Sequence, residues 1–194
     1  MPVLSMLIYA FVASFTPGPN NIMSLMFANQ YGFKRTVRFC LGVGTGFFAL
    51  LLLSSYFNLL LKNYIPKIEF FMAIVGMVYM LYLAFIIIRS KGDSEDPNGG
   101  KYNSFVAGVF LQFVNPKAVL YALTVVSTFV LPYHTSNSSL LFYSVVLAVI
   151  GFMGTFSWSI FGSLFKKFLA KYRSQFNIVM ALLLVYSAVS ILVR

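Results

Sequence analysis

The sequence predicts an all-α membrane protein with six transmembrane helices in two inverted three-helix repeats, the first and fourth helices being broken near the midplane. Of its 194 residues, 60% are hydrophobic and 9% are charged, whereas a soluble domain carries roughly 25% charged residues. Six long apolar stretches follow one another, and two of them contain internal prolines. Since no extended hydrophilic part remains, we expect a single transmembrane domain over residues 1–194.

A bilayer core about 30 Å thick needs about 20 apolar residues in a helix. Six stretches meet this requirement: 3–28, 39–61, 68–88, 104–131, 139–163 and 175–193. The segment 89–103 between the third and fourth stretches holds three of the four acids, with the glycines and proline of a linker. It divides the chain into a first repeat at about 1–88 and a second at about 104–194.

The two halves share a weak internal similarity. The broken stretches come first in each half, and the second stretch of each carries Gly-Thr followed by aromatic residues, at 44–48 and 154–158. The third stretches share Tyr-x-Ala, at 82–84 and 186–188. Each match is weak alone, but the same order across three pairs indicates an internal duplication.

Positive charge predicts the orientation, because cytoplasmic loops are enriched in Lys and Arg. The first, third and fifth loops contain Lys34, Arg35, Arg38, Arg89, Lys91, Lys101, Lys166, Lys167, Lys171 and Arg173. The opposite side has only Lys62, Lys67 and Arg194. We therefore expect both termini on the non-cytoplasmic side, and three spans per half give inverted repeats. If the first stretch is re-entrant instead, the N-terminus stays inside.

The break in the first stretch predicts a binding site. Proline in a helix costs about 3 kcal/mol, and lipid offers no water to the freed backbone groups. Glycine permits unusual backbone angles, and Asn20 and Asn21 suit the cap of a restarting helix, whose free amides attract anions. A proline kink used only for packing is the alternative. The expected site residues are Thr16, Pro17, Gly18, Pro19, Asn20 and Asn21.

The second break, at Asn115, Pro116 and Lys117, adds a charge. Asn115 can cap the helix after Pro116, a residue well tolerated at the first helical position. Lys117 lies mid-stretch, where a charge costs about 2.5–3.5 kcal/mol on insertion scales. None of the four acids lies within a stretch interior, so we expect Lys117 to bind a substrate carboxylate. The alternative is a lysine paired with backbone carbonyls at a helix break.

The same residues limit the substrate. A cationic side chain would need a buried acid, so a zwitterionic amino acid with a small polar or neutral side chain fits better. Gln112 and Tyr121 flank the second break, and Tyr82 and Tyr186 lie in the third and sixth stretches. These side chains can offer hydrogen bonds to a substrate, but packing in the core or at an interface is the favoured role of each tyrosine taken singly.

Other classes of protein are disfavoured. The net charge of +10 resides in short loops, which is typical of membrane topology and not of a nucleic-acid-binding face. One cysteine and one histidine exclude a disulfide and disfavour a metal site, a cofactor or a catalytic pair. A non-transporting structural membrane subunit stays an alternative. The expected partners are lipid and a small amino acid, and the sequence leaves open whether the chain forms a homo-oligomer.

The residues 16–21 and 112–117, with six apolar stretches and a charged central linker, resemble the LysE/RhtB superfamily of bacterial amino-acid exporters across essentially the whole chain. Residues 111–115, 127–132 and 176–186 are similar to its cysteine/O-acetylserine exporter branch. The resemblance implies efflux of amino acids or their derivatives across the bacterial cytoplasmic membrane. Homoserine, threonine and leucine are the alternative substrates.

Overall fold

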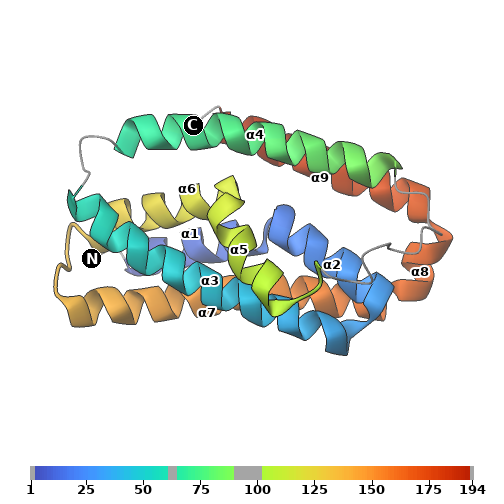
Figure 1. Ribbon diagram of the computed structural model, residues 1–194, viewed down its shortest axis with the longest axis horizontal. Helices are drawn as coiled ribbons and strands as arrows, with labels where there is room; N and C mark the ends of the chain where they lie inside the picture. The colour runs from blue at the N-terminus through green and yellow to red at the C-terminus, as the bar shows by residue number, and fades with distance from the viewer. Residues whose placement is uncertain (1–2, 61–64, 90–101, 193–194) are drawn as a thin grey trace.

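The computed structural model describes residues 3–60, 65–89 and 102–192, with side chains for 3–58, 70–89 and 102–190. Every regular element in these ranges is helical (Figure 1), which confirms the all-α class. The elements are α1 (Val3–Phe15), α2 (Pro19–Tyr31), α3 (Phe33–Leu60), α4 (Ile65–Arg89), α5 (Phe105–Val114), α6 (Pro116–Val125), the π-helical turn η1 (Val126–Val130), α7 (Asn137–Leu164), α8 (Lys166–Lys171) and α9 (Arg173–Leu192).

Both interruptions fall at the prolines. Residues 16–18 separate α1 from α2, and Asn115 separates α5 from α6. Asn115 is extended, with φ −81° and ψ 104°, because a residue that precedes proline is disfavoured in the helical region. Its side-chain Oδ1 accepts a hydrogen bond from the Lys117 amide at 3.1 Å, so the predicted cap is confirmed.

Four described helices, α3, α4, α7 and α9, are long and apolar enough to cross a membrane. The pair α5 and α6–η1 adds a fifth span if its two parts, bent by 67°, are taken together. Helix α1 is apolar but too short to cross alone. In Figure 1, α1 and α2 lie end to end along the long axis of the molecule.

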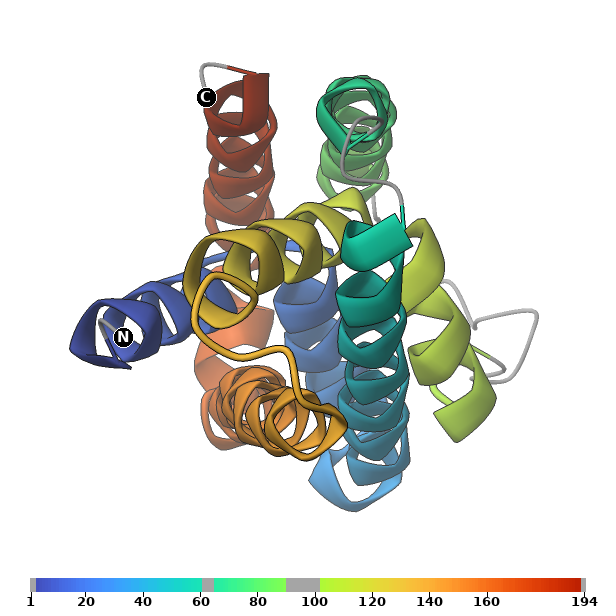
Figure 2. The ribbon, with the colours of Figure 1, turned by 90° about the vertical axis from the view of Figure 1, so that its left-hand side faces the viewer.

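The helices form a main bundle and a separate pair. Helices α4 and α9 pack side by side, and Figure 2 shows them standing apart from the others. In the main bundle, α3 packs against α5 and α7, while α1 and α2 both contact α7. Contacts between α4 and α6 join the pair to the bundle. The two breaks thus lie between the long helices, whereas the outer faces of α1 and α5 are exposed.

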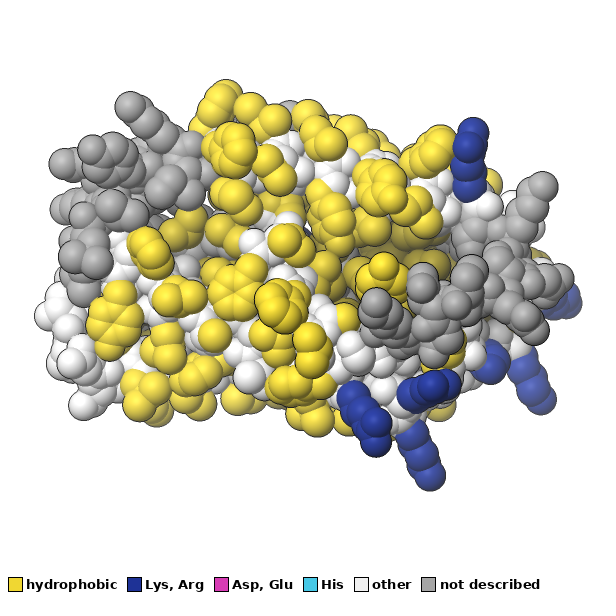
Figure 3. All heavy atoms as spheres, viewed as in Figure 1, with side chains coloured by type: hydrophobic (Ala, Val, Ile, Leu, Met, Phe, Trp, Pro, Cys, Tyr) yellow, Lys and Arg dark blue, Asp and Glu magenta, His cyan; other side chains and the backbone are white. Residues whose placement is uncertain are grey.

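The outer surface is largely apolar (Figure 3). Large side chains such as Phe70, Phe110 and Leu164 are 67%, 67% and 76% exposed. Helices that are hydrophobic all round need an apolar environment on every side, so this surface suits contact with lipid chains.

The visible Lys and Arg side chains gather at one end of the molecule, on the right of Figure 3. In Figure 1 the start of α3, the end of α4 and α8 all lie at that end. Part of the charge pattern lies outside the described residues: the linker 90–101 and the side chains of Lys62, Lys67, Lys91, Lys101, Arg194, Glu69, Asp93, Glu95 and Asp96.

Glycine allows α3 and α5 to cross at close range. A Cβ atom on Gly108 would collide with the backbone of Phe39 and Val43, and one on Gly42 would collide with the backbone of Phe105. Small residues at such crossings are characteristic of membrane helix packing. Close helix packing therefore explains both Gly42 and Gly108.

Gly108→Ala should destabilise the protein, because the added methyl group forces α3 and α5 apart. The expected cost is about 1–3 kcal/mol, as for other overpacked cores. Thermal unfolding of the protein in detergent micelles measures it. The control is Val106→Leu, which enlarges a side chain on the same helix that is 60% exposed. Equal unfolding midpoints for both variants would show that the crossing tolerates the methyl group.

Candidate functional site

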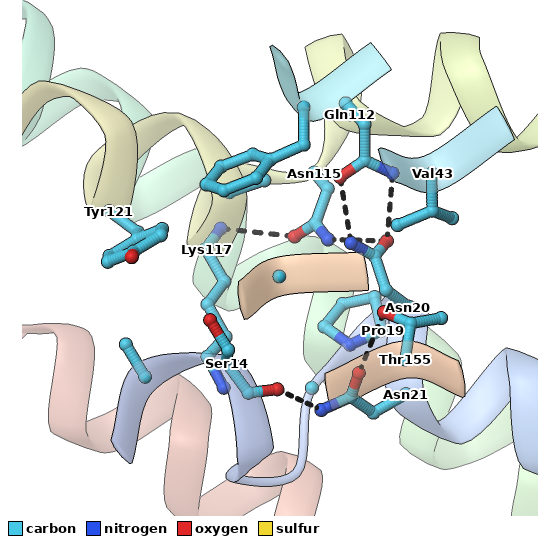
Figure 4. A pocket seen from close by; sticks show the side chains of 15 residues that line it. Ser14, Pro19, Asn20, Asn21, Val43, Gln112, Asn115, Lys117, Tyr121 and Thr155 are labelled. Atoms are coloured by element: carbon cyan, nitrogen blue, oxygen red, sulfur yellow. Dashed lines mark hydrogen bonds between the residues drawn. The ribbon is translucent and has the colours of Figure 1, made fainter. Parts of the chain in front are cut away.

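The two helix breaks face each other across a polar cavity (Figure 4). The cavity leaves about 50 Å³, room for only a few water molecules. Its walls come from α1, α2, α3, α5, α6 and α7. The lining residues are Ala13, Ser14, Gly18, Pro19, Asn20, Asn21, Val43, Phe47, Gln112, Asn115, Lys117, Ala118, Tyr121, Gly151 and Thr155.

Three amide side chains join the first break to the second. The Asn20 Nδ2 donates to Gln112 Oε1 at 2.8 Å, and the Gln112 Nε2 donates back to Asn20 Oδ1 at 3.3 Å. The Asn115 Nδ2 also donates to Asn20 Oδ1, at 2.9 Å. Gln112 and Asn115 are 0% and 2% exposed. Because buried amides must be paired, this cluster holds α2 against α5 and the start of α6.

The Asn21 side chain makes hydrogen bonds to carbonyl groups at the end of α1. Its Nδ2 donates to the backbone oxygens of Ser14 and Thr16, at 2.8 and 2.9 Å. Its Oδ1 accepts from Thr155 Oγ1 on α7 at 3.1 Å. In an unbroken helix these two oxygens would accept from the amides of residues 18 and 20, so the Asn21 side chain replaces helical hydrogen bonds that the break removes.

Two further donors from distant helices reach neighbouring carbonyls of the same segment, including the Phe15 oxygen, which the missing Pro19 amide would have bonded. Trp158 Nε1 on α7 donates to the Phe15 oxygen at 3.0 Å. Ser187 Oγ on α9 donates to the Pro17 oxygen at 3.1 Å. The unwound end of α1 is thus hydrogen-bonded to α7 and α9 as well as to α2.

Lys117 also reaches this end of α1. Its Nζ donates to the backbone oxygens of Thr16 and Pro17 at 3.1 and 3.0 Å, and to Thr16 Oγ1 at 2.9 Å. None of the described side chains is acidic. The geometry is that of the alternative interpretation, a lysine bound to carbonyls at a helix break. A cation at a helix C-terminus also interacts favourably with the helix dipole.

The start of α2 differs from expectation. Gly18 is the N-cap in an extended conformation, Pro19 is the first helical residue, and no side chain caps the helix. The prediction that Asn20 or Asn21 caps α2 is wrong, because Pro19 begins the helix earlier. Their side chains instead bond to Gln112 and to the end of α1.

The structure brings most of the predicted site residues to the cavity wall: Gly18, Pro19, Asn20, Asn21, Gln112, Asn115, Lys117 and Tyr121. Thr16 and Pro17 do not line it but supply the oxygens that bind Lys117. The ring of Pro116 points elsewhere and packs against Gly76 on α4.

The two tyrosines of the third and sixth stretches do not contribute hydrogen bonds to the cavity. Tyr82 and Tyr186 are 58% and 72% exposed, and neither lines the cavity. Conversely, the sequence analysis missed Ser14 and Thr155 as lining residues. Ser14 lies two residues before the first break, and Thr155 belongs to the repeated Gly-Thr pair. That proximity and that repeat were the available signals.

Apolar membrane-spanning helices around a polar cavity built from two broken helices define a membrane transporter. The chain belongs to the LysE type translocator family, which it matches over residues 11–194. It is therefore a multi-pass membrane protein and a transporter, not an enzyme.

Its relatives include cysteine/O-acetylserine efflux proteins of Escherichia coli (strain K12), Shigella sonnei (strain Ss046) and Shigella flexneri. Each is 40% identical over 183 residues, which cover 94% of this chain and 93% of the relative. No solved structure matches the chain.

Asn21→Ala should lower the unfolding midpoint, because the Ser14 oxygen and the Thr155 hydroxyl lose a buried partner. Leaving such groups unpaired costs about 1–3 kcal/mol each. Thermal unfolding in detergent measures the loss. Asn137→Ala, at an exposed position on α7, is the control and should unfold like the wild type. A midpoint for Asn21→Ala equal to that of the control would contradict this role.

Proposed function

We propose that the protein exports small neutral amino acids, cysteine and O-acetylserine, from the cytoplasm across the bacterial inner membrane. The names of its 40% identical relatives support this substrate class. The observation that carries the proposal is a cavity whose one charged lining residue, among those described, is Lys117. Such a cavity suits a ligand that brings its own carboxylate.

The carboxylate is bound by Lys117 together with the start of α2. The first amides of α2 lack a side-chain cap, whereas the start of α6 is capped by Asn115. Uncapped helix N-termini attract anions. The carboxylate therefore belongs at α2 and Lys117, and the amide cluster of Asn20, Gln112 and Asn115 supplies further polar contacts.

Substrate binding requires this cavity to widen. About 50 Å³ is below the several hundred Å³ of typical ligand pockets. The contacts that hold it closed are those between the two breaks, in particular the bonds from Lys117 Nζ to Thr16 and Pro17. A substrate carboxylate offers Nζ a charged acceptor in exchange for two carbonyls, and so favours an open arrangement.

The proposed transport cycle is alternating access between two inverted repeats of one transporter domain. The repeats are residues 1–88 and 104–194. In each repeat the broken pair, α1–α2 or α5–α6, is the first span, and the two pairs run in opposite senses along the axis in Figure 1. Rocking of one repeat against the other exposes the cavity to each side in turn. The positively charged end (Figure 3) is the cytoplasmic one, and both termini are on the non-cytoplasmic side.

Counterflow in proteoliposomes tests the substrate. We expect exchange of O-acetylserine and cysteine to exceed that of homoserine, threonine and leucine. Preference for homoserine, threonine or leucine would change the proposed substrate but would still show that the protein is a transporter. Vesicles that move none of the five would favour a non-transporting structural subunit.

Lys117→Met should reduce counterflow to the background of empty vesicles, because the carboxylate loses its cationic partner. The amount and unfolding midpoint of the purified variant are measured alongside, since the bonds to Thr16 and Pro17 are lost too. Lys171→Met, at an exposed position on α8, is the control and should transport normally. Normal transport by Lys117→Met would overturn the carboxylate site.

Labelling with a membrane-impermeant maleimide tests the orientation. Cys40, which is buried, is first replaced by Ala. A cysteine added before Met1 should then react in intact cells, whereas Ser174→Cys, at an exposed position near the start of α9, should react only after permeabilisation. Protection of the added cysteine would show that α1 and α2 form a re-entrant pair.

A further inference from the structure

Two hydroxyl groups on one side of the cavity lack partners. Ser14 Oγ on α1 and Tyr121 OH on α6 are buried and lie near each other, but neither makes a hydrogen bond of normal geometry to any described group. Both residues line the cavity (Figure 4). A buried hydroxyl left unpaired costs about 1–3 kcal/mol, so two on one wall require an explanation.

Packing holds the Tyr121 ring in place. The ring stacks on Phe47 of α3, with centroids 5.2 Å apart and planes inclined by 15°. Tyr9 of α1 packs against it at 5.6 Å, and Tyr121 is only 7% exposed. A tyrosine used solely as a core residue gains nothing from a hydroxyl in this position, since phenylalanine has the same ring.

Tyr121 and Lys117 project from the same face of α6 into one cavity. The two residues are four apart on α6 and therefore lie on the same face, one turn of about 5.4 Å along the axis. Lys117, Tyr121 and Ser14 line the same cavity, so the side chain of a substrate whose carboxylate is bound at Lys117 can reach the two hydroxyls. The Asn20–Gln112 amide cluster lies on the other side of Lys117 in Figure 4.

We infer that Ser14 and Tyr121 form a side-chain subsite that selects amino acids carrying a hydrogen-bonding group at the β or γ position. This inference rests on the proposed transport of a neutral amino acid through the same cavity. Thiol, hydroxyl and ester groups pair with the two hydroxyls, whereas an alkyl side chain of equal size leaves both unpaired. A site built to bond a polar group rejects analogues that lack it more strongly than a methylene can be rejected.

The test is the ratio of cysteine to 2-aminobutyrate counterflow in proteoliposomes under reducing conditions. The two substrates differ by a thiol in place of a methyl group. We expect the wild type to favour cysteine and the double variant Ser14→Ala, Tyr121→Phe to lower the ratio about tenfold. Because both rates are measured on the same preparation, a loss of folded protein cancels from the ratio.

The double variant Tyr82→Phe, Ser190→Ala is the matched control. It removes the same two groups from positions that are exposed on α4 and α9, and it should keep the wild-type ratio. O-Acetylserine measured against 2-amino-5-methylhexanoate, whose alkyl side chain has the same number of heavy atoms, repeats the comparison with a longer side chain.

The outcomes separate this inference from the transport proposal. A wild type that moves both substrates without preference, or prefers the alkyl one, overturns the subsite and leaves transport standing. An unchanged ratio in the Ser14, Tyr121 double variant also overturns it. A wild type that moves neither substrate, nor any of the five above, rejects the transport proposal and this inference with it.

Discussion

The structure depends on the carbonyl groups at the end of α1 that have no backbone amide partner within the helix. Pro17 and Pro19 lack two of the amides that would bond them, the break displaces the others, and the apolar surroundings require each freed oxygen to find another donor. The donors come from Asn21 on α2, Trp158 on α7 and Ser187 on α9, with Lys117 on α6. One local break therefore joins helices from both halves of the chain.

This arrangement gives Lys117 two interactions with helix ends. Its backbone lies in the first turn of α6, where the helix dipole opposes a cation, but its ammonium reaches the C-terminus of α1, where the dipole favours one. The same ammonium lines the cavity. A group that is bound to carbonyls and can also accept a substrate carboxylate is suited to couple binding with separation of the breaks.

Much of the fold could be predicted because its causes are local. The apolar stretches follow from composition, and the positions of both breaks follow from prolines that lack an N–H group wherever they stand. The cap by Asn115 is equally local, since it spans two residues. The start of α2 was misjudged because Pro19 suits the first helical position better than the asparagines after it suit the cap.

The sequence by itself determined the helical class, the two breaks and the presence of one cation within an apolar stretch. Only the tertiary structure decided that Lys117 bonds to Thr16 and Pro17 and that Ser14 lies on the cavity wall, whereas Tyr82 and Tyr186 face outward. The physical reason is the distance along the chain over which each interaction acts. A proline acts on its own turn, but the donor that pairs a freed carbonyl is chosen by the packing of helices distant in sequence.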